Sequence, residues 1–137
     1  MTHKIIFLDL PHVLVVGGKV SPSAVAVLND LTDGTGADLV LLPTWPDDLL
    51  FADIRAALAE IGVTANIVSC CPCVPAFGRA GEVQMWLDEH RWHVATYIIL
   101  STDDGFSEEF GNRLVLVDDP LGLTPEIATK AAQVLGL

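Results

Sequence analysis

Residues 4–14 have the sequence Lys4-Ile-Ile-Phe-Leu-Asp9-Leu-Pro-His12-Val-Leu14. A short and continuously apolar run of this kind predicts a buried β-strand over residues 4–9. The strand would carry one carboxylate, Asp9, at its C-terminal end. Ligand sites of open α/β sheets lie beyond the carboxyl ends of the strands. Asp9 is therefore a candidate nucleophile or metal ligand.

The rest of the chain alternates between strand-like and helix-like segments. Apolar runs predict further strands over residues 37–42, 66–69, 95–100 and 114–117. Apolar spacing and end signals predict helices from Ser21-Pro22 to about Thr32, from Asp47 or Asp48 to Gly62, over residues 79–90, and from Thr124-Pro125 onward. Gly17-Gly18 between valines predicts a tight hairpin within residues 13–20.

Buried strands that alternate with amphipathic helices indicate a parallel sheet covered on both faces. The predicted fold class is α/β, a Rossmann-like three-layer sandwich around a central parallel sheet. The chain has 137 residues, of which 51% are hydrophobic, and its mean hydropathy is +0.49. This length and composition predict one domain over residues 1–137 with a sizeable core.

Composition also limits the function classes. The formal net charge is −11, and the seven Lys and Arg residues are scattered, so nucleic acid is not expected as a partner. No apolar run approaches the roughly 18 to 20 residues that cross a bilayer, so no membrane association is expected. Three cysteines within four positions do not form a disulfide framework, which favours a reducing, cytoplasmic compartment. The high hydrophobicity is compatible with an apolar surface that forms a homodimer.

The cysteines Cys70, Cys71 and Cys73 raise the alternative of a zinc or thiol-redox site. Structural zinc sites usually pair such ligands with a second pair elsewhere, and here only four histidines could complete the set: His3, His12, His90 and His93. Packing of the cysteines as small hydrophobic residues is the favoured interpretation.

Five stretches together resemble a known family. They are Phe7-Leu-Asp9-Leu-Pro-His-Val-Leu14, Thr35-Gly-Ala-Asp-Leu-Val-Leu-Leu-Pro-Thr-Trp45, Arg79-Ala-Gly-Glu-Val-Gln-Met-Trp-Leu87, Tyr97-Ile-Ile-Leu-Ser-Thr-Asp103 and Leu114-Val-Leu-Val-Asp-Asp-Pro-Leu-Gly-Leu-Thr124. With the hairpin after the first strand, they are similar to the small capless branch of the haloacid dehalogenase (HAD) superfamily found in bacterial RNA-repair proteins. The resemblance covers nearly the whole chain and implies a HAD-like core without a large cap.

The resemblance also implies roles for individual residues. Asp9 matches the nucleophile that attacks a phosphoryl group, while Thr44 and Arg79 match the residues that hold phosphate oxygens. A small phosphorylated ligand is the implied partner. The implied cofactor is Mg²⁺, and Asp9, Asp103 and Asp104 are the candidate metal ligands.

Three departures from the family pattern put turnover in doubt. Pro11 stands where the family has its acid/base aspartate, and Ser101 and Thr102 stand where it has acidic metal ligands. Magnesium binding is therefore predicted to be weak. His12 could act as a substitute general acid, because imidazole titrates near neutral pH. We favour a phosphatase-like pseudoenzyme that acts in ligand binding or protein interaction. The alternative is a weak or altered phosphohydrolase that uses Asp9 and His12.

Overall fold

A computed structural model describes residues 3–9, 13–42, 50–118 and 120–136. Its main sheet has five parallel strands in the order β5-β4-β1-β6-β7. These strands are β1 (His3–Leu8), β4 (Asp38–Leu41), β5 (Ile67–Cys70), β6 (Val94–Ser101) and β7 (Leu114–Leu116). A separate antiparallel hairpin joins β2 (Val15–Val16) to β3 (Lys19–Val20). The predicted parallel sheet is confirmed.

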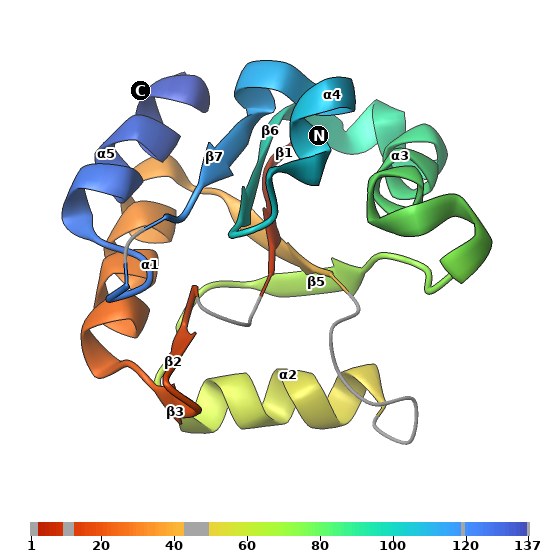
Figure 1. Ribbon diagram of the computed structural model, residues 1–137. Coiled ribbons are helices and arrows are strands. Elements are labelled where there is room, and N and C mark those ends of the chain that lie inside the picture. The colour runs from red at the N-terminus through yellow and green to blue at the C-terminus, as the bar shows by residue number, and fades with distance from the viewer. Residues whose placement is uncertain (1–2, 10–12, 43–49, 119, 137) are drawn as a thin grey trace.

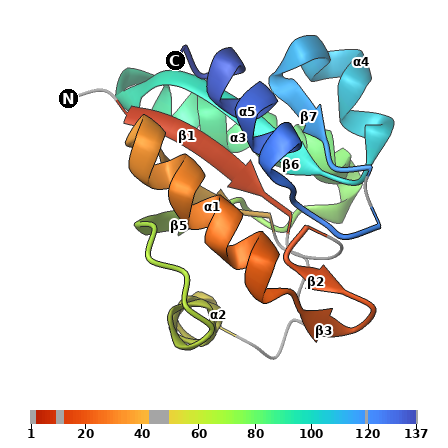
Figure 2. The same ribbon diagram turned by 90° about the vertical axis from the view of Figure 1, so that its left-hand side faces the viewer.

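Helices cover both faces of the sheet (Figures 1 and 2). On one face lie α1 (Pro22–Thr35), α2 (Phe51–Glu60) and α5 (Pro125–Val134). On the other lie α3 (Gly78–His90) and the short α4 (Ser107–Phe110). Short 3₁₀ turns span Pro75–Phe77, Arg91–His93, Asp104–Phe106 and Gly111–Arg113. The predicted three-layer α/β class is therefore confirmed.

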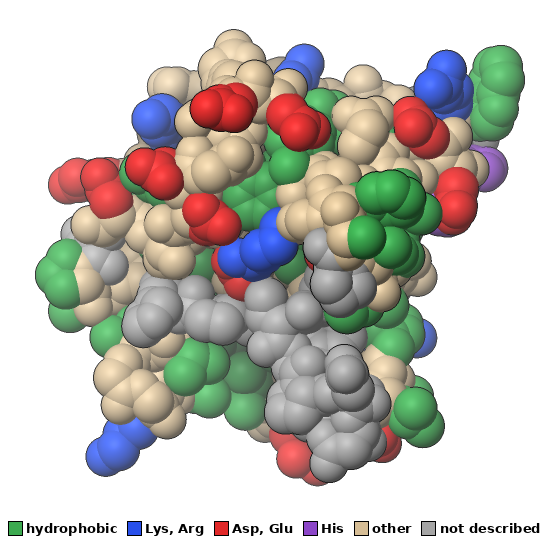
Figure 3. All heavy atoms as spheres, turned by 45° about the vertical axis from the view of Figure 1, so that its right-hand side comes forward, with side chains coloured by type: hydrophobic (Ala, Val, Ile, Leu, Met, Phe, Trp, Pro, Cys, Tyr) green, Lys and Arg blue, Asp and Glu red, His purple; other side chains and the backbone are tan. Residues whose placement is uncertain are grey.

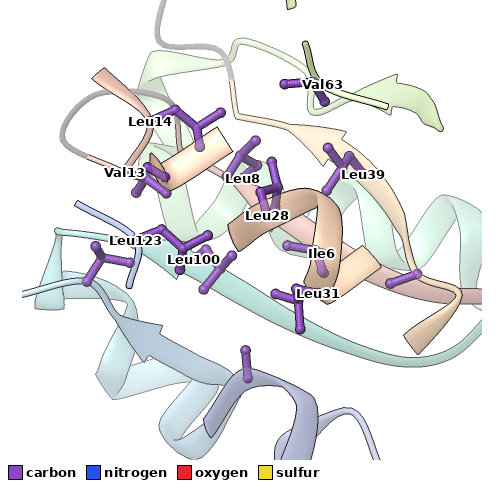
Figure 4. Close-up of a cluster of buried hydrophobic side chains, with 14 of the residues drawn as sticks. Ile6, Leu8, Val13, Leu14, Leu28, Leu31, Leu39, Val63, Leu100 and Leu123 are labelled. Atoms are coloured by element: carbon purple, nitrogen blue, oxygen red, sulfur yellow. The ribbon is translucent and has the colours of Figure 1, made fainter. Parts of the chain in front are cut away.

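The two apolar layers follow from side-chain alternation along the strands. In β1, Ile6 and Leu8 join the cluster that contains Leu28 of α1, as Figure 4 shows. Ile5 and Phe7 join the opposite cluster, which contains Trp86 of α3. Successive strand residues point to opposite faces, so a strand buried on both faces must be apolar throughout. This is the physical reason that the continuous apolar run predicted a central strand.

The same alternation positions the polar ends of β1 and β6. Phe7 and Ile99 are register partners and share the α3 side of the sheet. Two residues further along each strand, the chain reaches Asp9 and Ser101, so both side chains return to the α3 side. The backbone N–H of Asp9 donates to the carbonyl of Leu100 at 3.0 Å, which continues the parallel register to the strand ends.

Several predicted element ends are confirmed. Ser21 caps α1, because its Oγ accepts from the N–H of Ala24 at 3.3 Å. Thr124 caps α5 in the same way through Ile127. Gly17 and Gly18 have φ of 62° and 79°, the left-handed conformation that the tight hairpin requires.

Other predicted ends are wrong. Helix α1 continues to Thr35 rather than stopping near Thr32, because Gly36 supplies the left-handed C-cap. Helix α2 begins at Phe51 with Leu50 at its N-cap position, later than predicted. The candidate caps Asp47 and Asp48 lie outside the described residues. Asp53, inside the first turn, accepts from the Leu50 N–H at 3.3 Å. The short α4 was not predicted, because its four residues are too few to show a helical period.

None of the helices in the described ranges is long and apolar enough to span a lipid bilayer.

Candidate functional site

The centre of the candidate site is the Asp9 carboxylate at the C-terminal end of β1. Asp9 is only 3% exposed. A buried carboxylate is costly unless it is paired or hydrogen-bonded. Its partners therefore decide what it can do.

The first partner is Arg79, in the first turn of α3. Its Nη2 lies 2.6 Å from Asp9 Oδ2. Nη2 makes no well-aligned hydrogen bond, so the contact is best described as a close ion pair. The Arg79 side chain is 36% exposed and so connects the buried carboxylate to the protein surface.

The second partner is Ser101, at the C-terminal end of β6 and fully buried. Its hydroxyl donates to Asp9 Oδ2 at 2.8 Å. The same Oγ accepts from the backbone N–H of Asp103 at 3.0 Å. The hydroxyl proton therefore points at Asp9, and one lone pair of the oxygen is already engaged.

Asp103 joins the same group from the loop after β6. Its Oδ2 lies 3.5 Å from Arg79 Nη1, and its Oδ1 accepts from the N–H of Gly105 at 2.9 Å. Asp104 is exposed in the following 3₁₀ turn, and its carboxylate pairs with no described residue. The arginine thus stands between two carboxylates, Asp9 and Asp103.

A pocket of about 230 Å³ opens beside this group, lined by Phe77, Gly78, Arg79, Ala80, Asp103, Gly105 and Phe106. The Phe106 ring lies under the guanidinium, with 5.4 Å from Arg79 Cζ to the ring centroid. This is the distance of a cation–π contact. The pocket is small, and two of its lining residues, Arg79 and Asp103, are charged.

The structure brings together three of the predicted site residues, Asp9, Arg79 and Asp103. Asp104 follows Asp103 directly, but its carboxylate forms no hydrogen bond or ion pair with these three residues. His12 and Thr44 lie outside the described residues, as does Pro11.

The role of Ser101 was missed at the sequence level, where it was noted only as the replacement of an acidic residue. Pairing of β1 with β6 was the missing information, because the register alone places Ser101 beside Asp9. Phe106 was missed as well, since no sequence signal links it to Arg79. Buried Glu82 was also missed; it accepts from the N–H of Val74 at 2.5 Å and holds the loop before α3.

The fold and this arrangement of residues define a haloacid dehalogenase-like domain. Residues 5–128 match the family described as "HAD domain in Swiss Army Knife RNA repair proteins", and the chain belongs to this family. No curated protein and no solved structure matches the chain.

The HAD family typically uses Mg²⁺, and the described residues do not fit that ion well. Within the described ranges, no group of three or more His, Cys, Asp or Glu side chains could hold a metal. Asp9 Oδ2 already contacts Arg79 and accepts the Ser101 hydroxyl proton, and one lone pair of the Ser101 oxygen is engaged by the N–H of Asp103. Magnesium needs near-octahedral oxygen coordination, which these groups do not supply.

The three cysteines differ in their surroundings, although all are free thiols. Cys71 is buried, and burial raises the pKa of its thiol, with smaller contributions from Cys70 and Glu82. Burial also raises the pKa of the Cys70 thiol. Packing as a small hydrophobic residue therefore describes Cys71 well. The same interpretation is wrong for Cys73, which is exposed.

Thiol titration at pH 8 should separate these sites. A thiol with a raised pKa is less ionised at a given pH, and the thiolate is the reactive form. We expect Cys73 to react first with a disulfide reagent, Cys70 more slowly, and Cys71 only in denaturant. Peptide mass spectrometry after brief labelling would identify each modified residue. Rapid labelling of Cys71 in the native protein would contradict its burial and reopen the redox alternative.

Proposed function

We propose that this chain is a non-catalytic HAD domain, a phosphatase-like pseudoenzyme that acts by binding rather than by turnover. One observation carries the proposal: the Ser101 hydroxyl donates to Asp9 Oδ2, at a position where the family resemblance places an acidic metal ligand. The nucleophile candidate is thus held by a neutral donor of the chain itself.

The chemistry of phosphoryl transfer supports this proposal. Such transfer depends on positioning and on neutralising the charge of the phosphoryl group. Asp9 Oδ2 already contacts both Ser101 and Arg79, so it is not free to attack. Pro11, at the position of the acid/base aspartate, has no side-chain proton to donate. Nucleophile, acid and metal ligands are thus all weakened in the same chain.

A small phosphorylated ligand is the first candidate for binding. It is supported by the partly exposed Arg79, which lines the 230 Å³ pocket. RNA is not proposed as the ligand of this domain, although the family description names RNA repair proteins. The net charge is −11, and on the face drawn in Figure 3 the described Lys and Arg side chains lie apart from one another and form no positive patch. Phosphate backbones bind to concentrated positive charge.

Three further predictions stay open beside this proposal. They are a single domain over residues 1–137, a cytoplasmic location and a homodimer. Free thiols are compatible with a reducing compartment. Each prediction needs its own measurement, by limited proteolysis, cell fractionation and light scattering respectively.

A second candidate function is a weak phosphohydrolase. It is favoured by Asp9 Oδ1, which is buried and has no hydrogen-bond partner among the described residues. An oxygen in that condition is chemically available, provided that a substrate reaches it. His12 would be the acid in this case, as the sequence suggested.

A turnover assay decides between the two candidates. We expect wild-type protein with p-nitrophenyl phosphate and Mg²⁺ to release product no faster than the Asp9→Asn variant. Loss of general acid catalysis alone lowers a rate by a factor of about 10² to 10⁴. Wild-type turnover that Asp9→Asn abolishes would refute the pseudoenzyme proposal. In that case His12→Gln would test the substitute acid.

A further inference from the structure

We propose that Arg79 is the built-in counter-cation of Asp9, and that it excludes a divalent metal ion from this end of the sheet. The inference rests on the proposed non-catalytic function and gives it a physical cause. In HAD enzymes a metal ion supplies positive charge at this place. Here the covalently attached side chain of Arg79 would supply it instead.

Neighbouring groups of the chain compensate the charge of Asp9. Asp9 is buried, and a buried carboxylate needs a partner charge or hydrogen bonds. Arg79 supplies the charge at 2.6 Å, and Ser101 supplies a hydrogen bond at 2.8 Å. Both contact the same oxygen, Oδ2. The charge of Asp9 is thus compensated within the chain, while its Oδ1 has no hydrogen-bond partner among the described residues.

Neighbouring groups fix the position of the guanidinium. Asp103 Oδ2 lies 3.5 Å from its second terminal nitrogen, Nη1. The N–H of Gly105 holds the other oxygen of Asp103. A Cβ at position 105 would stand 3.0 Å from that oxygen, so glycine allows this tight turn. Phe106, which is 1% exposed, packs against the guanidinium. Asp9, Asp103 and Phe106 thus all contact the Arg79 guanidinium.

These contacts oppose the binding of an incoming cation. A divalent ion at this place would meet the positive charge of Arg79 and the donated proton of Ser101. A charge within about 4 to 6 Å of a site changes the affinity of that site for a unit charge by a factor of about 10 to 10³, and a like charge lowers it. The carboxylates that would attract the ion, Asp9 and Asp103, are both already paired with the same guanidinium.

The test measures the binding of two divalent ions. Binding of Mn²⁺, a spectroscopic probe, is followed by electron paramagnetic resonance, and binding of Mg²⁺ is followed by calorimetry. We expect wild-type protein to show no Asp9-dependent site. The variant Arg79→Gln should bind the ion at least about tenfold more tightly than wild type, because it frees two carboxylates. Arg79→Lys keeps a cation and should stay close to wild type.

Arg113→Gln is the matched control. Arg113 also packs on an aromatic ring, with 5.4 Å from its Cζ to the Tyr97 centroid, and it donates to Thr96 Oγ1 at 2.7 Å. It forms no ion pair with a described carboxylate. Its substitution removes the same unit of charge from the protein. If Arg113→Gln gains as much affinity for the cation as Arg79→Gln, the gain reflects net charge alone and the proposal is overturned.

Two further outcomes keep the proposal falsifiable. Wild-type binding of Mg²⁺ that disappears in Asp9→Asn would overturn it, whether or not Arg79→Gln folds. An Arg79→Gln chain that folds only when Mn²⁺ is added would support it. Turnover is measured separately with p-nitrophenyl phosphate, so an active wild-type protein without a metal site would refute the proposed function while leaving the role of Arg79 intact.

Discussion

Replacement of Arg79 by Gln is expected to lower the free energy of unfolding by about 3 kcal/mol, near the lower end of the range for breaking a buried ion pair. The loss is large because the substitution leaves Asp9 buried without its counter-charge. It stays near the lower end because the Arg79 side chain is 36% exposed. Urea denaturation followed by tryptophan fluorescence would measure it.

A double-mutant cycle identifies the cause of that loss. Asp9→Asn removes the buried charge, so the double variant should be less destabilised than the sum of the two single variants. We expect a coupling of about 2 kcal/mol between the two positions, within the range for residues in one ion-pair network. The pair Arg113→Gln and Asp9→Asn should show no coupling, because Arg113 bonds to Thr96 and the Tyr97 carbonyl instead. Additive effects for Arg79 would mean that it stabilises through packing on Phe106 and not through Asp9.

The sheet and most helices could be predicted from the sequence, because they depend on local patterns. The continuous apolar run before Asp9 requires burial on both faces, and Ser21-Pro22 carries its cap and its first-turn proline side by side. Helix α2 shows where this reasoning fails. Its capping carboxylate, Asp53, lies inside the helix, while the more obvious candidates Asp47 and Asp48 precede it.

The candidate site could be predicted only in part, because its contacts join residues far apart in the chain. Asp9, Arg79 and Asp103 were identified through their places in the family pattern, and these three do converge. The direction of the Ser101 hydroxyl depends on the strand register, and the contact of Phe106 depends on the fold of a loop. Neither follows from spacing along the sequence. His12 and Thr44 stay predictions, since they lie outside the described residues.

Restoring the missing acidic residues is expected to have the largest effect on activity. The variant Pro11→Asp, Ser101→Asp, Thr102→Asp should hydrolyse p-nitrophenyl phosphate at least about 10² times faster than wild type, because general acid catalysis alone contributes about 10² to 10⁴. The choice of Pro11 rests on the sequence pattern, whereas Ser101 is placed by its bond to Asp9. Asp9→Asn in this background should abolish the gain.

Magnesium should stabilise the fold of this variant as well as support its reaction. Ser101 is fully buried and its side chain adjoins Asp9, so an aspartate there puts two like charges in one buried site. Such a pair is unfavourable without a cation between its members. The carboxylates added at positions 101 and 102 should outweigh the single positive charge of Arg79, so we expect the thermal midpoint of the variant to rise with Mg²⁺ and that of wild type to change little. A second variant that keeps Pro11 but carries both other changes separates the effect on stability from the effect on turnover. It should gain Mg²⁺-dependent stability without the full rate of hydrolysis.

A triple variant that folds and binds Mg²⁺ yet remains inactive would show that Arg79, still paired with Asp9, blocks the nucleophile by itself.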